Sequence, residues 1–325
     1  MKAALLTDYA GPEAIVLREL PEPAPAEGEV LLGFEAAEVN YPDALVVSGR
    51  YQTRPPLPFI PGKTIVGRVL DARGAAAPAR GARVIAHVEY GAFAERVALP
   101  AAACLPVPQG IGAADAAALG LNYQTAHFAL AARGGLAAGE NVLVLGASGA
   151  VGAAALQLAR PLGAARVLAG IRSEAAAAAA LADGADAALR LDQGAELREQ
   201  VAAATGGRGV DVVIDPLGDA LTAAALRCLA PCGRLVVVGF AAGEIPQIRS
   251  NYLLVKNVGV LGLNWADHRD REPARVAAAQ AAIFALFLEG RLRPRIHRRL
   301  PLAAAAEALG LVARGGLPGR VLLEG

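Results

Sequence analysis

The stretch Asn141–Arg160 reads NVLVLGASGAVGAAALQLAR. Its first part, Val142–Leu145, has no polar alternation, as expected of a parallel strand buried on both faces. The bend that follows, Ala147–Gly152, has the form G-x-G-x-x-G with alanine at the first glycine position. Gly149 would let the backbone approach a pyrophosphate, and the free amides at the helix start would face its charge. We interpret the stretch as a dinucleotide-binding element, with a merely tight strand-to-helix turn as the alternative.

The residues downstream of this turn alternate between apolar strand-like runs and helix-forming runs. This alternation predicts a doubly wound parallel sheet, the Rossmann arrangement, with helices between its strands. Besides Val142–Leu145, the predicted strands are Arg166–Ile171, Ala187–Leu191, Val210–Asp215, Arg234–Gly239 and Val258–Leu263.

The first part of the chain has a different sequence pattern. Short strand-like runs such as Val30–Phe34 and Arg83–Ala86 are separated by proline clusters, which predicts a mostly β domain. A helix over Pro273–Leu288 and a last strand over Arg320–Leu323 are expected to return to it. The predicted domains are therefore residues 1–122, 123–264 and, as a return to the first domain, 265–325.

Composition excludes several classes of function. The 325 residues include 55% hydrophobic ones and carry a net charge of +1, which gives no bulk attraction to nucleic acid or membranes. No transmembrane segment is evident, and a cytoplasmic protein is expected. Neither the three cysteines nor the four histidines have the spacing of a metal site, so none is predicted. The arginine-rich stretch 291–299 is interpreted as a strand with a solvated face, and RNA binding through it as a minority hypothesis.

The end of the second predicted strand of the sheet distinguishes between nicotinamide cofactors. An acidic residue there is typical of NAD, whereas a 2′-phosphate requires cations and hydroxyl donors. Arg172 and Ser173 stand at this point and favour NADP(H). In the alternative, Ser173 only caps a helix, Arg172 is a solvated charge, and Glu174 meets the ribose.

Polar groups in the first domain and at the domain junction are candidates for substrate contacts. Asn40 is a candidate to hold a nicotinamide or a substrate carbonyl, and Tyr51 is a candidate to cap or donate into a substrate pocket. The cluster Asn122–Thr125 lies where clefts between domains form. Simple packing and helix capping are the competing interpretations.

Together these motifs resemble the zinc-independent quinone oxidoreductases of the medium-chain dehydrogenase/reductase superfamily, over nearly the whole length. The resemblance implies a GroES-like catalytic domain, a Rossmann domain, NADPH as cofactor and a homodimer joined through the edge strand Val258–Leu263. The motifs that carry it are Asn40–Asp43 with Gly49 and Tyr51, Pro61–Gly62 with Gly67, Gly91–Glu95, Thr125–Ala126, Gly146–Gly152, Gly207–Val212 and Asn251–Asn257.

The resemblance also implies roles for single residues. Asn40 and Thr125 would lie near the nicotinamide, and Tyr51 and Tyr123 would border the substrate. The turn residues Ser148, Gly149, Ala150 and Val151 would meet the pyrophosphate, Arg172 and Ser173 the 2′-phosphate, and Phe240 the nicotinamide end. Thr64 stands where family members usually have glutamate, which puts a buried ionic contact in doubt.

The expected function is an NADPH-dependent oxidoreductase that transfers hydride to a quinone or another α,β-unsaturated carbonyl acceptor without a metal. Conjugated acceptors spread the incoming charge, so positioning alone supplies much of the acceleration. Two alternatives share these motifs. One is a 2-enoyl thioester reductase, and the other is an NADPH-binding protein with little turnover that resembles lens crystallins and binds RNA or serves a structural role.

Overall fold

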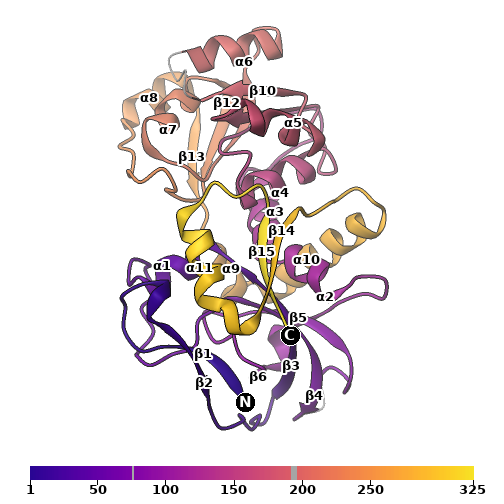
Figure 1. Ribbon diagram of the computed structural model, residues 1–325. Coiled ribbons are helices and arrows are strands. Elements are labelled where there is room, and N and C mark those ends of the chain that lie inside the picture. The colour runs from indigo at the N-terminus through magenta and orange to yellow at the C-terminus, as the bar shows by residue number, and fades with distance from the viewer. Residues whose placement is uncertain (75–76, 192–195) are drawn as a thin grey trace. The chain divides into compact units, whose positions relative to one another are not determined.

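The computed structural model describes residues 1–74, 77–191 and 196–325, which form two compact units (Figure 1). Unit 1 comprises Met1–Asn122, Ala266–Leu288 and Pro294–Gly325. Unit 2 comprises Tyr123–Trp265 and Glu289–Arg293. Each unit has its own sheet and its own hydrophobic core.

Unit 2 contains a six-stranded sheet in which every neighbouring pair of strands is parallel. The strand order is β10-β9-β8-β11-β12-β13, so the chain starts in the middle and winds outward in both directions. The prediction of a doubly wound Rossmann sheet is confirmed. Its strands are β8 (Asn141–Val144), β9 (Arg166–Ile171), β10 (Ala187–Arg190), β11 (Val210–Asp215), β12 (Leu229–Val237) and β13 (Gly259–Gly262).

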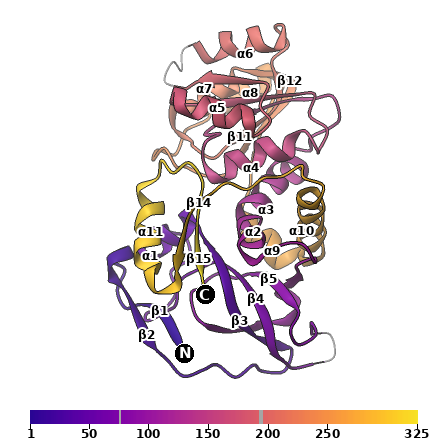
Figure 2. The same cartoon turned by 45° about the vertical axis from the view of Figure 1, so that its right-hand side comes forward.

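Helices cover both faces of this sheet. Figures 1 and 2 show α4 and α6 on opposite sides of it. The central strands β8 and β11 are entirely buried, which explains why their sequences lack polar alternation. The helices are α4 (Ala150–Ala159), α5 (Glu174–Ala182), α6 (Leu197–Thr205), α7 (Asp219–Leu226) and α8 (Ser250–Lys256).

One strand of unit 2 differs from its prediction. We expected a strand over Arg234–Gly239, but β12 begins five residues earlier, at Leu229. Its pairing with β11 is irregular between Val210 and Val212. Cys232 within it has a φ of 63°, and its N–H donates to the carbonyl oxygen of Asn257. The proline and glycine that flank Cys232 disguise this first half as a turn in the sequence.

Unit 1 is mostly β, as predicted. A small sheet pairs β1 (Lys2–Leu6) with β2 (Ile15–Glu19), and a larger one has the order β14-β15-β3-β4-β5-β7 with β6 paired to β3. The last strand, β15, lies between β14 and β3 and pairs antiparallel with β3, so the end of the chain returns to the sheet of unit 1 (Figure 2). The strands of the larger sheet are β3 (Glu29–Val39), β4 (Thr64–Ala72), β5 (Arg83–His87), β6 (Arg96–Pro100), β7 (Cys104–Pro106), β14 (Ile296–Pro301) and β15 (Arg320–Glu324).

The remaining helices are divided between the two units. The predicted helix Pro273–Leu288 is observed with these bounds as α10. In the described parts of the chain, no helix combines the length and the apolar character needed to cross a membrane. The other helices are α1 (Tyr41–Val47), α2 (Ala113–Ala118), α3 (Leu121–His127), α9 (Trp265–Arg271) and α11 (Ala305–Arg314), and a π-helix follows α3 at Phe128–Arg133.

Residues 289–293 correct one predicted boundary. The sequence places them with the first domain, but they pack with unit 2. The reason is a pair of hydrogen bonds around the Gln157 amide. Gln157 Nε2 donates to the carbonyl oxygen of Arg293, and the Arg293 N–H donates to Gln157 Oε1.

Candidate functional site

The glycine-rich turn of unit 2 lies between the end of β8 and the start of α4. Gly146 has a φ of 58°, a left-handed conformation that glycine adopts without strain. A Cβ on Gly152 would lie 2.3 Å from the carbonyl oxygen of Gly146. Only glycine therefore lets α4 pack this closely to the turn, and the predicted packing role of Gly152 is confirmed.

The start of α4 fits an anionic ligand. Gly149 is its N-cap residue and, as a glycine, makes no side-chain capping hydrogen bond. Ser148, Gly149 and Ala150 are all exposed. The N-terminus of a ten-residue helix carries partial positive charge, and a glycine at the cap leaves room for a phosphate to approach the backbone.

Two arginines stand at the carboxyl ends of the neighbouring strands β9 and β10. Arg172 follows β9 directly and is exposed. Arg190 is the last residue of β10 and is paired in register with Ile171, the residue before Arg172. The parallel pairing thus brings a second arginine to the same edge of the sheet, although it is 18 positions away in the sequence.

The contacts around Arg172 and Arg190 help to compare two interpretations of this edge. In one the arginines bind a 2′-phosphate, and in the other Glu174 binds the ribose. Ser173 takes the N-cap position of α5, but its side chain makes no capping hydrogen bond. The Glu174 carboxylate lies 3.6 Å from the Arg190 guanidinium, which gives it a partner other than a ribose. The Gln200 side chain accepts from the N–H of Arg190 and donates to its carbonyl oxygen, which fixes the backbone of this outer strand.

Three further predicted residues have different surroundings. Phe240 follows β12, is 41% exposed, and packs over Gly218, where a Cβ would lie 2.9 Å from the ring. Thr125 is half-buried on α3. Tyr123 is completely buried, and its hydroxyl donates to Gln157 Oε1 at 2.7 Å. The Tyr123 hydroxyl is therefore held within the core of unit 2, and its place beside a substrate stays a prediction.

In unit 1, Asn40 is built into a chain of buried polar contacts. It precedes α1, and its N–H donates to Asp43 Oδ2 at 2.8 Å, which caps the helix. Its Nδ2 donates to the carbonyl oxygen of Glu38, and its Oδ1 accepts from Asn122 Nδ2 at 2.8 Å. Both ends of the side-chain amide are thus used within unit 1.

A second polar cluster, which we call the Tyr51 cluster, comprises Tyr51, Lys63, Glu89 and Arg269. The Lys63 ammonium lies 4.7 Å from the centroid of the Tyr51 ring and donates to Glu89 Oε1 at 2.7 Å. Arg269, on α9, lies 3.1 Å from the other oxygen of the same carboxylate. Two cations therefore share one carboxylate beside a phenol.

The buried groups of unit 1 titrate away from their ordinary ranges. Burial raises the pKa of Tyr51 to about 12, and the negative charges of Glu89 and Asp43 act in the same direction. Burial also raises the pKa of Asp43 to about 6, against the opposing charge of Lys63. Burial would raise the pKa of Glu89 as well, but the hydrogen bonds and charges of Lys63 and Arg269 outweigh it and hold that pKa low.

The position of Thr64 resolves the doubt about a buried ionic contact. Thr64 is buried on β4, opposite His87 on β5, and its hydroxyl lies 3.3 Å from His87 Nδ1. Burial lowers the pKa of His87 to about 4, so this contact is between neutral groups near pH 7. The ionic contact of this region is made by Lys63 and Glu89 instead, immediately outside the paired residues.

Sequence reasoning did not single out Lys63, Glu89 or Arg190. Lys63 and Glu89 are 26 positions apart, and only the antiparallel register of β4 and β5 brings them together. A signal for Lys63 was present, because a lysine inside the run Pro61–Val66 is unusual before a buried strand. The closeness of Arg190 to Arg172 becomes apparent only when the ends of the paired strands β9 and β10 are compared.

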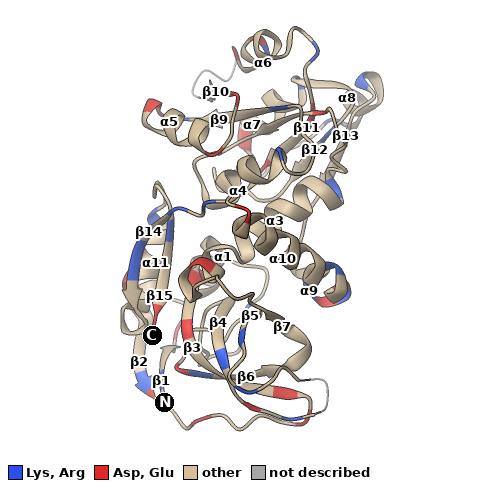
Figure 3. Cartoon of the chain, turned by 90° about the vertical axis from the view of Figure 1, so that its right-hand side faces the viewer, with Lys and Arg blue, Asp and Glu red and all other residues tan. Residues whose placement is uncertain are grey.

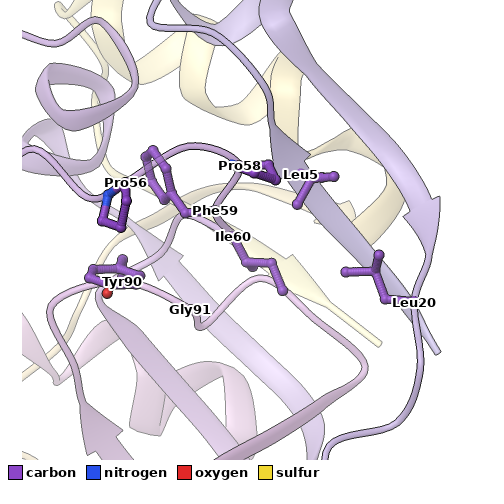
Figure 4. A pocket seen from close by; sticks show the side chains of 8 residues that line it. All are labelled: Leu5, Leu20, Pro56, Pro58, Phe59, Ile60, Tyr90 and Gly91. Carbon is purple, nitrogen blue, oxygen red and sulfur yellow. The ribbon is translucent and has the colours of Figure 1, made fainter.

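A hollow of about 460 Å³ in unit 1 has a different character (Figure 4). Apart from the Tyr90 phenol, the side chains that line it are apolar, so it offers little chemistry. Its lining residues are Leu5, Leu20, Pro56, Pro58, Phe59, Ile60, Tyr90 and Gly91. Among the residues that the structure describes, no group of three histidines, cysteines or acidic residues is placed to hold a metal ion.

The arginine-rich stretch is only partly a strand. β14 begins at Ile296, and its basic residues are visible in blue in Figure 3. Arg298 lies 3.7 Å from Glu307, and Arg299 lies 3.2 Å from Glu324. Carboxylates of unit 1 thus balance part of this charge, as expected of a solvated strand face.

Two family models match this chain. One match lies within unit 1, and the other covers most of unit 2 and continues into α9 and α10. The model described as the alcohol dehydrogenase GroES-like domain matches residues 26–109, and that described as zinc-binding dehydrogenase matches residues 150–280.

Relatives match over almost the full length. Quinone oxidoreductase-like protein 2 of Bos taurus is 33% identical over 99% of this chain and 92% of its own. The structure of a quinone oxidoreductase from Thermus thermophilus, described also in complex with NADPH, is 38% identical with a TM-score of 0.85 and covers 100% of both chains. That of a probable oxidoreductase from Mycobacterium abscessus is 37% identical with a TM-score of 0.89, covering 100% of this chain and 99% of that one. The chain therefore belongs to the quinone oxidoreductase-like family of the medium-chain dehydrogenase/reductase superfamily, and it is an oxidoreductase.

Proposed function

We propose that this chain is an NADPH-dependent reductase that transfers hydride to a quinone or another α,β-unsaturated carbonyl compound. The observation that carries the proposal is the edge of the unit 2 sheet. There a helix with a glycine N-cap follows a glycine turn, Arg172 follows β9, and Arg190 ends β10. The relative from Thermus thermophilus, whose described complex contains NADPH, supports the choice of cofactor.

In this proposal unit 2 binds the cofactor. Ser148, Gly149, Ala150 and Val151 meet the pyrophosphate at the start of α4, where glycine allows close approach. Arg172, Ser173 and Arg190 meet the 2′-phosphate, because guanidinium groups match phosphate geometry. Phe240 and Thr125 line the nicotinamide end.

Bound NADPH would supply a hydride, and unit 1 would supply the contacts to the acceptor. Tyr51 is the proposed proton donor. Its raised pKa keeps the phenol protonated over the whole physiological range, so it can donate but not act as a base. Conjugation in the acceptor spreads the charge that hydride transfer adds, so the proposed reaction requires no metal ion.

Asn40 is proposed to lie near the nicotinamide and also to hold the chain before α1. Because Glu38 and Asn122 hold both ends of its amide, Asn40 positions the turn before α1. Tyr123 is proposed to border the substrate, with its hydroxyl held by Gln157.

The test is the oxidation of NADPH by the purified protein against quinones, enones and 2-enoyl thioesters. We expect turnover with quinones or simple enones. Turnover confined to the thioesters would identify a 2-enoyl thioester reductase instead. Saturable NADPH binding without oxidation by any member of the panel, together with salt-sensitive RNA binding, would support the crystallin-like alternative and refute the proposal.

We also propose that two copies associate through β13. This strand lies at one end of the sheet order, so one of its edges has no neighbouring strand among the described residues. Leu254 and Val255, on the helix that precedes it, are 83% and 77% exposed. Paired edge strands and covered apolar side chains would explain both features.

A cytoplasmic location is part of the proposal, supported by three cysteines in the free form.

A further inference from the structure

A buried lysine lies against the face of the proposed proton donor. The Lys63 side chain is only 7% exposed, and its ammonium is 4.7 Å from the centroid of the Tyr51 ring. A cation at this distance is attracted by the electrons of the ring face. The attraction is stronger for a tyrosinate, whose ring carries part of a full negative charge.

The Lys63 ammonium is held in place by two hydrogen bonds to a single residue. It donates to the Glu89 carboxylate at 2.7 Å and to the Glu89 carbonyl oxygen at 2.9 Å. The backbone fixes this pair as well. Thr64 is paired with His87, and the Val88 N–H donates to the carbonyl oxygen of Lys63. The lysine is therefore oriented by the β4–β5 hairpin before any ligand binds.

We propose that Lys63 is a positioning residue that acts through Tyr51, by stabilising the tyrosinate that forms when Tyr51 protonates the reduced acceptor. This inference rests on the proposed function. With an α,β-unsaturated ketone, the hydride that bound NADPH would supply adds to the β-carbon, and the cofactor would leave as NADP⁺. The electron pair of the C=C bond then moves toward the carbonyl group and gives an enolate. The O–H bond of Tyr51 then breaks as its proton passes to the enolate, and the tyrosinate regains a proton from water.

The groups around Tyr51 show why a cation is needed there. Asp43, on α1, and Glu89, after β5, both raise the pKa of the phenol, and burial raises it further. Arg269, on α9, lowers it. Proton donation from such a phenol is costly unless positive charge lies close to the ring. Lys63 is oriented to provide it, since it lies over the ring face.

A purely structural role for the Lys63–Glu89 pair makes a different prediction. Lys63→Gln and Glu89→Gln both break the ion pair, so a structural role moves Tyr51 in the same way in both variants. The electrostatic role requires opposite effects. Loss of the cation disfavours the tyrosinate, whereas loss of the carboxylate favours it. Glutamine at position 63 retains an N–H donor for Glu89, which helps this variant to fold.

The first measurement is the phenol pKa itself. A fluorinated tyrosine at position 51 is more acidic and titrates in an accessible pH range, where fluorine NMR follows it without any turnover. We expect Lys63→Gln to raise its pKa by about one unit, Glu89→Gln to lower it by a similar amount, and Lys63→Arg to leave it near the wild-type value. The exposed Lys2→Gln serves as the control for loss of a lysine. A shift in the same direction in the first two variants, or no shift in Lys63→Gln, would overturn the proposal.

The second measurement is kinetic. With an enone acceptor we expect Lys63→Gln to lower kcat about tenfold with the KM for NADPH unchanged, and Lys63→Arg to restore most of the rate. In a Tyr51→Phe background, Lys63→Gln should have no further effect. If Lys63→Gln lowers kcat equally in the Tyr51→Phe background, the inference about Lys63 is wrong, whereas the proposed reductase function is unaffected. A wild-type protein that reduces no acceptor contradicts the proposed function, and the NMR titration still decides the charge effect of Lys63.

Discussion

At the scale of single residues, the proposed chemistry depends on a few charged side chains whose neighbours are set by the fold. Arg172 and Arg190 illustrate this, because each is an ordinary exposed or half-exposed arginine until the register of β9 and β10 places them together. Lys63 and Glu89 illustrate it for unit 1. In both cases the residue type was visible in the sequence, and its partner was not.

Replacing Arg172 with alanine should weaken NADPH binding about 10- to 100-fold, because a charge-assisted hydrogen bond contributes about 1.5–3 kcal/mol. NADH lacks the 2′-phosphate, so its dissociation constant should stay within about twofold of the wild-type value. Fluorescence titration of both cofactors measures this. The exposed Arg198→Ala, on α6, is the matched control. Equal losses for NADPH and NADH would refute the assigned role.

Replacing Arg190 with alanine should also weaken NADPH more than NADH, by about 3- to 10-fold. The effect is smaller because Arg190 must leave its ion pair with Glu174 to meet the phosphate. Glu174→Gln removes that competitor and should tighten NADPH binding. A Glu174→Gln variant that weakens NADPH instead would favour the interpretation in which Glu174 holds the ribose.

At the scale of the elements, two glycines of the turn from β8 into α4 have different surroundings, and we assign packing to Gly152 and binding to Gly149. Gly152 touches backbone atoms that cannot yield, whereas a Cβ on Gly149 would lie 3.3 Å from the Gly146 carbonyl oxygen, with a φ of −73° that any residue adopts. We therefore expect the two glycines of one motif to differ in function. Gly152 lets the helix pack, and Gly149 is proposed to leave space for the pyrophosphate.

Gly152→Ala should destabilise the protein by about 1–3 kcal/mol, because the added methyl group forces α4 away from the turn. Gly149→Ala should leave the thermal unfolding temperature almost unchanged but weaken NADPH and NADH alike, since both contain the pyrophosphate. Unfolding without cofactor and cofactor titration together measure the two effects. Similar loss of stability in both variants would contradict this division of roles.

At the scale of the whole molecule, buried charge links the stability of unit 1 to pH. The Glu38 carboxylate is 1% exposed and lies 3.0 Å from the guanidinium of the buried Arg320, which joins β3 to β15. Burial raises the pKa of Glu38 to about 7, more than the charge of Arg320 and the hydrogen bond from Asn122 lower it. The folded protein therefore binds this proton more tightly than the unfolded chain does.

The sign of the pH effect follows from that difference. The stabilisation from the bound proton is fully present below the unfolded pKa, near 4.5, and is lost as the pH rises through about 7. Relative to Glu38→Gln, the wild type should lose about 2–3 kcal/mol between pH 5 and pH 8. Arg320 stays charged throughout, so its effect on the variant is constant. Unfolding curves across this range test the slope, and a wild-type advantage that grows with pH would contradict the argument.

The proposed dimer is also a property of the whole molecule. Placing glutamates at Leu254 and Val255 should convert a dimer into a monomer, because it puts two charges on the covered apolar surface. Sedimentation equilibrium measures the change. Leu181→Glu, on an exposed but distant helix, α5, should remain dimeric. A wild-type monomer at micromolar concentration would dispose of the proposal.

The sequence by itself determined the doubly wound sheet, the glycine turn and the mostly β first domain, because these depend on local signals. An apolar run, a bend of small residues and the helix over Pro273–Leu288 are each readable within about twenty positions. Tertiary structure alone decided the rest. It buried the Tyr123 hydroxyl on Gln157, moved residues 289–293 to unit 2 and paired Lys63 with Glu89. These outcomes depend on strand register and on contacts between distant positions, and a linear pattern does not specify which polar group meets which.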